Sequence, residues 1–163
     1  MEDREIHLKF KEFPNKSELE QEDRLLFEKA IAAAESAYAP YSKFSVGAAV
    51  LLSNGEIVKG SNQENIAYPS GLCAERVALF AASANHPGVP IDAVAVTAKL
   101  QHQEPGSSVT PCGACRQVIL EYERLFEHPV RVITGAIDGP ISVFENAKSL
   151  LPMAFFDKGI GKE

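Results

Sequence analysis

The stretch FSVGAAVLLSNGEIVKGSNQ, residues 44–63, decides the fold class of this chain. Two runs that are typical of strands, FSVGAAVLL and EIVKGSNQ, are joined by Ser53, Asn54 and Gly55. An Asn-Gly pair tolerates the positive φ angles of a tight hairpin turn. The two runs are therefore predicted to pair as antiparallel strands.

The segments on both sides of this hairpin have the spacing of helices. Upstream, from about Glu22 to Ala39, small and apolar side chains recur in steps of four, three and four residues, at Leu26, Ala30, Ala33 and Ala37. APYS at 39–42 is expected to end this helix, because proline disfavours helical geometry in the preceding residue. Downstream, a second helix is predicted from about Leu72 to Asn85, and HPG at 86–88 stops it.

Two further β-branched runs, IDAVAVTA at 91–98 and VRVITG at 130–135, flank a third predicted helix that starts near Pro111. Such runs are predicted to be parallel neighbours buried on both faces. Residues 1–21 form an N-terminal extension, in which the alternation of Ile6, Leu8 and Phe10 with polar residues predicts an edge strand. Because strands and helices alternate, the pattern predicts an α/β protein with a mixed sheet.

Composition narrows the function class. The 163 residues are 45% hydrophobic, which predicts a single domain over residues 1–163. A net charge of −6 gives long anionic polymers no attraction, so no nucleic-acid partner is expected. The apolar runs are too short for a membrane span, so no membrane is expected. Three cysteines and no stretch resembling a signal peptide predict the reducing cytoplasm.

Two of the three cysteines stand together in PCGACRQ, residues 111–117. With Thr110 as N-cap and Pro111 as the first helical residue, Cys112 lies in the first turn and Cys115 one turn further on, on the same face. A helix N-terminus favours thiolates, and two adjacent thiolates suit a zinc ion. A redox dithiol is the alternative, but a redox helix usually follows a strand directly, and here a polar loop precedes the pair.

Cys73, in SGLCAER, opens the second helix and supplies the third thiolate. Alone, a cysteine in an alanine-rich helix is most often a small buried hydrophobe, but the pair on another helix start favours one shared zinc ion per chain. Three ligands leave a tetrahedral zinc open for water, as in catalytic sites. A closed site would need a histidine; none has zinc-ligand spacing to a cysteine, and His102 in a nearby loop is the remaining alternative.

Glu75 and two arginines follow the cysteines directly. Glu75 supplies a carboxylate that can take a proton from a zinc-bound water, if its side chain reaches around the metal; the alternative is a solvated residue that complements the helix dipole. Three thiolates make the zinc site negative, and either Arg76 or Arg116 could donate to sulfur and draw charge off it. The alternative is that both are ordinary surface arginines.

CAER at 73–76 followed by PCGACRQ resembles the small homotetrameric zinc-dependent cytidine deaminases of pyrimidine salvage, in the cytidine and deoxycytidylate deaminase superfamily. The resemblance runs from about Tyr38 to Phe156, through YAPYSKFSVGAAV, NQENIAY and LLPMAFF. It implies a three-layer cytidine-deaminase-like α/β fold, with a mixed sheet of about five strands and helices on both faces. The N-terminal extension lies outside it.

The resemblance also implies roles for the candidate residues at the metal. Cys73, Cys112 and Cys115 would bind Zn²⁺. Glu75 would move protons between the zinc water, the pyrimidine N3 and the departing ammonia, while a zinc-bound hydroxide attacks C4. Arg76 would hydrogen-bond the zinc thiolates.

Further residues match the family's nucleoside pocket. Asn62 and Glu64 would hold the ribose hydroxyls, because alternation in a strand points both to one side and a carboxylate accepts hydroxyl hydrogen bonds. Phe44 would pack on the pyrimidine. Phe155, or else Phe156, would reach an active site built partly by neighbouring subunits, so a homotetramer is expected.

The implied reaction is hydrolysis of cytidine and 2′-deoxycytidine to uridine and 2′-deoxyuridine plus ammonia. In one alternative, the protein performs the same chemistry on a modified nucleoside, a nucleoside antibiotic or a base within nucleic acid. The reason is that PSGL at 69–72 is not the commonest sequence at this place in the family. Another is a zinc-binding module without catalysis.

Overall fold

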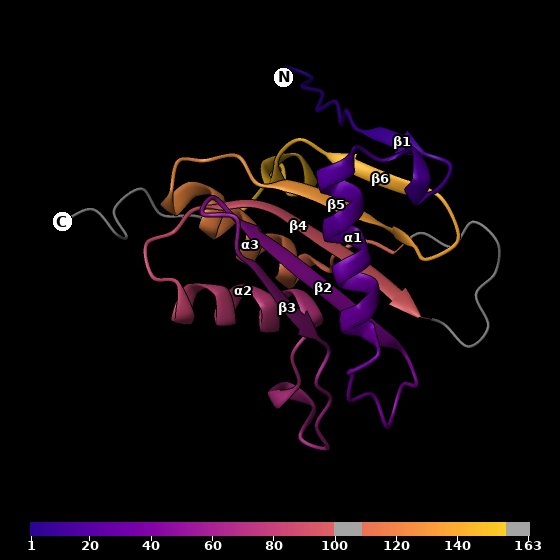
Figure 1. Cartoon of the computed structure of the whole chain (residues 1–163). Helices are drawn as coiled ribbons and strands as arrows, with labels where there is room; N and C mark the ends of the chain where they lie inside the picture. The colour runs from indigo at the N-terminus through magenta and orange to yellow at the C-terminus, as the bar shows by residue number, and fades with distance from the viewer. Residues whose placement is uncertain (100–108, 156–163) are drawn as a thin grey trace.

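A mixed sheet of six strands forms the middle layer of the computed structural model, within its described residues 1–99 and 109–155 (Figure 1). Across the sheet the order is β1 (Lys11–Phe13), β6 (Ile141–Phe144), β5 (Arg131–Ala136), β4 (Ile91–Lys99), β2 (Ser45–Leu52) and β3 (Ile57–Ser61). The β4 and β5 strands are parallel, and the other neighbours are antiparallel. The predicted hairpin and the predicted parallel pair are both confirmed.

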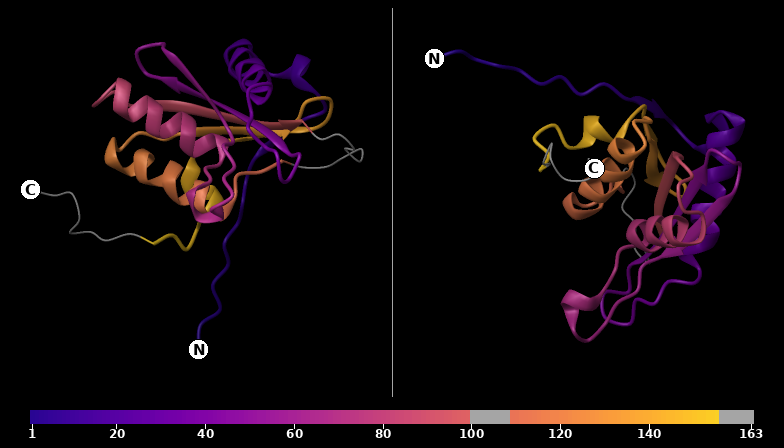
Figure 2. Two further views of the ribbon diagram at one scale, coloured as in Figure 1. Left: turned by 90° about the horizontal axis from the view of Figure 1, so that it is seen from below. Right: turned by 90° about the vertical axis from the view of Figure 1, so that its left-hand side faces the viewer.

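Helices cover both faces of the sheet (Figure 2). Helix α1 (Gln21–Ala34) packs on one face, and α2 (Ala74–Asn85) and α3 (Gly113–Leu125) pack on the other. The alternation of strand β2 shows why: Ala48, Val50 and Leu52 join the core under α2 and α3, whereas Ala49 and Leu51 join the core under α1. The predicted three-layer α/β fold is confirmed. The described part of the chain contains no helix of the length and apolarity that a membrane span requires.

Short 3₁₀ turns complete the secondary structure of the described ranges. They are η1 (Lys16–Glu18), η2 (Tyr68–Ser70) and η3 (Ala147–Leu150). The second of them lies in the connection between β3 and α2, which descends below the sheet beside the connection between α1 and β2 (Figure 1). These two connections carry several of the predicted site residues.

The edge of the sheet differs from the prediction. Strand β1 is Lys11–Phe13, not the alternating run Ile6 to Phe10, which is exposed. The Phe10 ring instead stacks on Phe144 of β6, with 5.0 Å between the ring centroids. Strand β6 is the sixth strand and was not predicted; its four residues follow a short turn after β5 and are too few to give a periodic signal.

Helix α1 ends five residues earlier than predicted, at Ala34, and not before Pro40. The Ser36 hydroxyl donates to the carbonyl of Ala33 at 2.9 Å, a local bond that competes with continued helix. Beyond it, the Tyr38 amide donates to the carbonyl of Asn62 at 3.0 Å. The chain therefore leaves the helix early to pair with the segment after β3.

Two glycines set the distance between helices and sheet. A Cβ at Gly47 would overlap the backbone of Ala30 and Ala34 in α1, and a Cβ at Gly60 would overlap the backbone of α2 at Ala74 and Ala78. Both helices therefore lie directly on the hairpin. The close contact at Gly60 brings the N-terminus of α2 next to the end of β3, where Asn62 follows.

Candidate active site

One cavity of about 850 Å³ gathers most of the predicted site residues. Its walls come from the start of β2, the connection between β3 and α2, and the N-termini of α2 and α3. The predicted residues that line it are Phe44, Asn62, Glu64, Cys73, Glu75, Arg76 and Cys112. We call the part around Cys73, Glu75, Cys112 and the adjacent Cys115 the metal end, and the part around Tyr41, Ser42, Asn62 and Glu64 the loop end.

The three cysteine sulfurs converge at the metal end. The Sγ of Cys112 lies 3.9 Å from that of Cys73 and 3.5 Å from that of Cys115, and all three lie within 4.8 Å of one another. Tetrahedral zinc with Zn–S bonds of about 2.3 Å holds its sulfurs about 3.8 Å apart, so this donor set fits one zinc ion per chain. Within residues 1–99 and 109–155, no other group of His, Cys, Asp and Glu converges in this way. His102 lies outside the described residues.

Two helix N-termini place these sulfurs. Cys73 is the N-cap of α2 and Cys112 the N-cap of α3, both with extended backbone, and Cys115 lies in the first turn of α3. The prediction of Thr110 as N-cap was therefore wrong by two residues. Arg116 explains the shift, because its Nε donates to the Pro111 carbonyl at 2.7 Å and holds that residue outside the helix.

Helix α2 also begins later than predicted, at Ala74 and not at Leu72. Both backbone groups of Leu72 are taken by Gln63: each amide donates to the other's carbonyl at 2.9 Å. This pairing holds the residue before Cys73 in extended conformation. It also connects the loop end to the metal end through the backbone.

The protein groups favour a thiolate at Cys73. A hydrogen bond from the Cys115 thiol, helped by the Arg76 guanidinium, lowers the pKa of Cys73 to about 5. The same bond, together with burial, raises the pKa of Cys115. The Arg76 Nη2 lies 3.6 Å from the Cys73 sulfur. The geometry therefore distinguishes the two candidate arginines, because the Arg116 guanidinium donates to the Pro111 and Leu150 carbonyls instead.

Glu75 is a buried acid in the first turn of α2, with only 4% of its surface exposed. Burial raises the pKa of its carboxyl, because the charged form loses solvation. The side chain lines the same cavity as Cys73 and Cys112. A desolvated carboxyl beside three cysteines that can bind a metal ion has the environment of a general acid or base.

At the loop end, the Asn62 side chain links the segment that follows β3 to the start of β2. Its Oδ1 accepts from the Val46 amide at 2.8 Å, and its Nδ2 donates to the Phe44 carbonyl at 2.9 Å. Asn62 therefore fixes the backbone that carries the Phe44 ring, and the ring lines the cavity. The sequence predicted a ligand contact for Asn62 but not this second contribution.

Glu64 is held by two residues that the sequence analysis did not single out. Its Oε2 accepts from the amides of Tyr41 at 2.9 Å and Ser42 at 3.3 Å, and its Oε1 accepts from the Ser42 hydroxyl. These bonds, the hydroxyl first, lower the pKa of Glu64. Tyr41 and Ser42 lie 22 and more residues upstream, and no spacing rule connects them to Glu64. The signal available was YAPYSKFSVGAAV, a segment of the family resemblance that contains both residues, although no role was assigned to either.

Phe155 is not brought to the cavity. Its ring is 80% exposed, and its backbone carbonyl accepts from the Gln117 Nε2 at 2.8 Å. The C-terminal segment is thus attached to the first turns of α3 while the ring faces outward. Phe156, the alternative residue, lies outside the described residues. Fold and site together define a zinc-binding α/β protein with a buried carboxylate beside the metal ligands.

Comparison with known proteins gives the family. Residues 20–126 match the cytidine and deoxycytidylate deaminase zinc-binding region. A cytidine deaminase of Halalkalibacterium halodurans is 41% identical over 132 residues, which are 81% of this chain and 92% of that protein. The crystal structure of cytidine deaminase from Burkholderia pseudomallei has a TM-score of 0.70 at 41% identity and covers 80% of this chain and 97% of its own.

The crystal structure of cytidine deaminase from Mycobacterium tuberculosis has a TM-score of 0.63 at 36% identity, with 82% of this chain and 96% of its own covered. The chain belongs to the zinc-binding cytidine and deoxycytidylate deaminase family. The predicted family, its α/β fold and its three-cysteine zinc site are confirmed.

Proposed function

We propose that this protein is a cytidine deaminase that hydrolyses cytidine and 2′-deoxycytidine to uridine and 2′-deoxyuridine plus ammonia. The observation that carries the proposal is the buried Glu75 carboxylate, which lines one cavity with Cys73 and Cys112 of the three-cysteine cluster. The names of the relatives support the same reaction.

Cys73, Cys112 and Cys115 would hold the zinc ion, which supplies the charge that makes a water molecule acidic near neutral pH. Glu75 accepts that proton and delivers it to N3 of the pyrimidine. The same carboxylate would then take the proton of the new hydroxyl on C4 and carry it to the amino nitrogen, so that the C4–N bond breaks, the C4 carbonyl forms and ammonia leaves. Burial supports this role, because it raises the pKa of the Glu75 carboxyl above its ordinary value, toward the range in which a general acid or base works best.

Arg76 acts on the ligands. Three thiolates leave a zinc site with net negative charge, which opposes ionisation of the water. The guanidinium that approaches the Cys73 sulfur at 3.6 Å offsets part of this charge. Arg76 is therefore a positioning and charge-tuning residue.

The loop end would hold the sugar and the base. The Glu64 carboxylate accepts a sugar hydroxyl, Asn62 contributes its amide, and Phe44 packs on the pyrimidine ring. All three line the cavity together with Glu75, which supports a nucleoside as the ligand that spans both ends.

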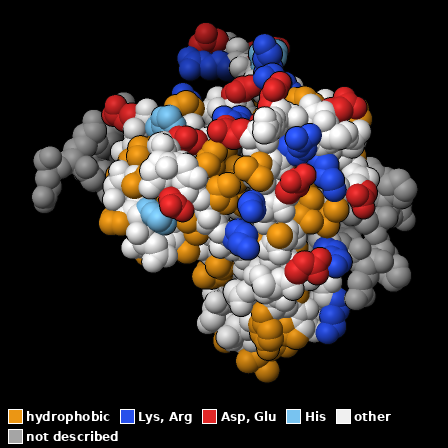
Figure 3. All heavy atoms as spheres, viewed as in Figure 1, with side chains coloured by type: hydrophobic (Ala, Val, Ile, Leu, Met, Phe, Trp, Pro, Cys, Tyr) orange, Lys and Arg blue, Asp and Glu red, His pale blue; other side chains and the backbone are white. Residues whose placement is uncertain are grey.

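We also expect a homotetramer in which Phe155 of one subunit completes a neighbour's cavity. Its exposed ring and the apolar tip of the molecule support this expectation (Figure 3). That tip carries Tyr38, Tyr41, Ile66 and Tyr68, each at least 47% exposed. The free thiols of the zinc site suit the reducing cytoplasm. The net charge of −6 supports free nucleosides, and not nucleic acid, as substrates.

The test is a spectrophotometric deamination assay with zinc quantified per chain. Its panel contains cytidine, 2′-deoxycytidine, cytosine, a blasticidin-like analogue and a single-stranded oligonucleotide. The expected result is conversion of the first two and one zinc per chain. Gly71 and Leu72, from the unusual PSGL segment, line the cavity, so the analogue is the informative competitor. Faster conversion of the analogue than of cytidine would contradict the proposed substrate.

A further inference from the structure

The Glu64 carboxylate has one acceptor site left for a ligand. A carboxylate oxygen offers two lone pairs, and Oε2 already accepts from the amides of Tyr41 and Ser42. Among the residues that the structure describes, Oε1 accepts from the Ser42 hydroxyl alone. The remaining lone pair that can receive a ligand hydroxyl therefore belongs to Oε1, the oxygen that Ser42 contacts.

The Ser42 hydroxyl has a fixed direction. The Phe44 amide donates to its Oγ at 3.1 Å, so Oγ is an acceptor on that side. Its own hydrogen is then free for Glu64, which accepts because the hydrogen bonds around it lower its pKa and keep it ionised. One hydroxyl thus connects the backbone of Phe44 to the carboxylate of Glu64.

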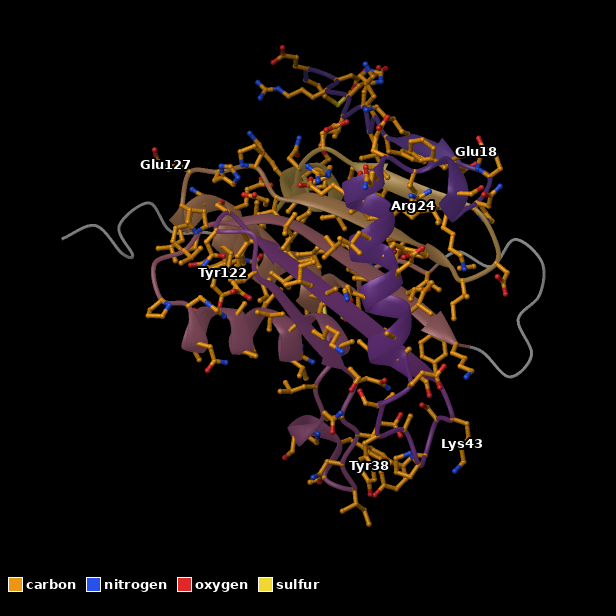
Figure 4. All side chains as sticks on the ribbon, in the orientation of Figure 1. Glu18, Arg24, Tyr38, Lys43, Tyr122 and Glu127 are labelled. Atoms are coloured by element: carbon orange, nitrogen blue, oxygen red, sulfur yellow. The ribbon has the colours of Figure 1, made fainter. Side chains whose placement is uncertain are left out.

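The loop that presents Ser42 is a closed turn at the lower end of the molecule, where Figure 4 labels Tyr38 and Lys43. The Lys43 amide donates to the Ala39 carbonyl at 3.1 Å, and Lys43 has a φ of 57°, in the left-handed region. Backbone in this region costs free energy, which neighbouring contacts must offset. Glu64 supplies contacts to the two residues before Lys43, whose consecutive amides converge on its carboxylate as in an anion-binding nest.

We propose that Ser42 is a positioning residue for nucleoside binding. Its hydroxyl orients Oε1 of Glu64 toward a sugar hydroxyl and fixes the position of this carboxylate relative to the Phe44 ring. This inference rests on the proposed function and adds a residue to it. Within the described residues, Ser42 forms its hydrogen bonds with Glu64 and Phe44 and none with the three cysteines or Glu75, so it acts on binding and not on the proton transfers.

The test compares two substrates in Ser42→Ala, Ser42→Thr and the unchanged protein. For cytidine, Ser42→Ala should raise KM about tenfold at nearly constant kcat, the loss of one hydrogen bond to a charged group. For 2′,3′-dideoxycytidine, which lacks the ring hydroxyls at C2′ and C3′ that Oε1 would accept and keeps only the 5′ hydroxyl, kcat/KM should change by less than about twofold. Ser42→Thr keeps the hydroxyl and should restore a KM within about twofold of the unchanged protein.

Ser53→Ala is the matched control. Ser53 is also an exposed serine whose hydroxyl donates to a carboxylate, that of Asp92, far from the cavity lining. It should leave KM for both substrates unchanged. Equal losses for cytidine and the dideoxynucleoside in Ser42→Ala, or a fall in kcat at constant KM, would overturn the inference while the proposed function stands. A zinc-loaded unchanged protein that converts no cytidine would overturn the proposed function and this inference with it.

Discussion

The metal end and the loop end of the cavity are built in different ways. At the metal end, the ligands sit at two helix N-termini, and Glu75 and Cys115 are buried. At the loop end, irregular segments far apart in the chain meet, and Tyr41 and Ser42 are exposed. The reacting groups are therefore fixed by secondary structure, whereas the sugar contacts are fixed by hydrogen bonds between loops. Substitutions at the metal end should therefore change zinc content and kcat, and substitutions at the loop end should change KM.

The largest effect is expected for Cys115→Ser. Cys115 is fully buried and its sulfur lies 3.5 Å from that of Cys112, so a hydroxyl in its place removes one of three thiolate ligands. Zinc content should fall to near zero and ammonia release with it. Metal analysis and the activity assay on the same sample check this, with circular dichroism to show that the fold persists. A variant that keeps one zinc per chain would contradict the ligand assignment.

At the loop end, Glu64→Ala should raise KM for cytidine by about tenfold to a hundredfold, since it removes hydrogen bonds to a charged group. Zinc content should stay at one per chain, because Glu64 bonds to Tyr41 and Ser42 and, in the part of the chain that the structure describes, to no cysteine. Steady-state kinetics with metal analysis measure both. Loss of zinc together with the rise in KM would contradict the separate roles of the loop end and the metal end.

Gly60→Ala tests the contact between the two ends. The added Cβ overlaps the backbone of α2 at Ala74 and Ala78, so the helix that carries Cys73 and Glu75 must shift. We expect a loss of about 1–3 kcal/mol in the free energy of unfolding, together with lower kcat and higher KM. Gly113→Ala is the control for stability, because a Cβ there meets nothing within 4 Å. Denaturant unfolding measures the free energy of unfolding of both variants. Equal values for the two would contradict the close packing of α2 on β3.

The smallest effect is expected away from both ends, at the sheet edge. Phe10→Ala removes the stack on Phe144 and should lower the free energy of unfolding by about 1 kcal/mol without changing kcat or KM. Ile6→Ala is the matched control, because Ile6 is 62% exposed. A change in kinetics for Phe10→Ala would mean that the N-terminal extension reaches the site.

The metal end could be read from the sequence because its signals are local. Cysteines at helix starts, three residues apart in one motif, and Glu75 beside the third cysteine fall under short-range rules. The hairpin with Asn54 and Gly55 and the parallel strands β4 and β5 gave equally local signals. What the spacing rules could not supply was the exact N-cap, which a side-chain bond from Arg116 to the Pro111 carbonyl, five residues upstream, shifts to Cys112.

The loop end was only partly predictable. Asn62 and Glu64 were found through a family motif, but Ser42 acts through the tertiary structure that folds its loop back onto Glu64. Strand β6 was missed because four residues give too short a pattern, and β1 was placed too early because Ile6 and Leu8 alternate without a partner strand. The Phe155 ring is exposed in the single chain, and its role in the proposed function depends on a neighbouring subunit.

The most direct test of the central claim measures zinc content and ammonia release together in Glu75→Gln. This change keeps the shape of the side chain and removes its ability to exchange protons, and Glu121→Gln on the exposed face of α3 is its control. The account predicts one zinc per chain in both variants, with turnover of cytidine lowered about 10²–10⁴-fold in Glu75→Gln alone. Turnover within a few fold of the unchanged protein, with zinc present, would contradict the role of Glu75.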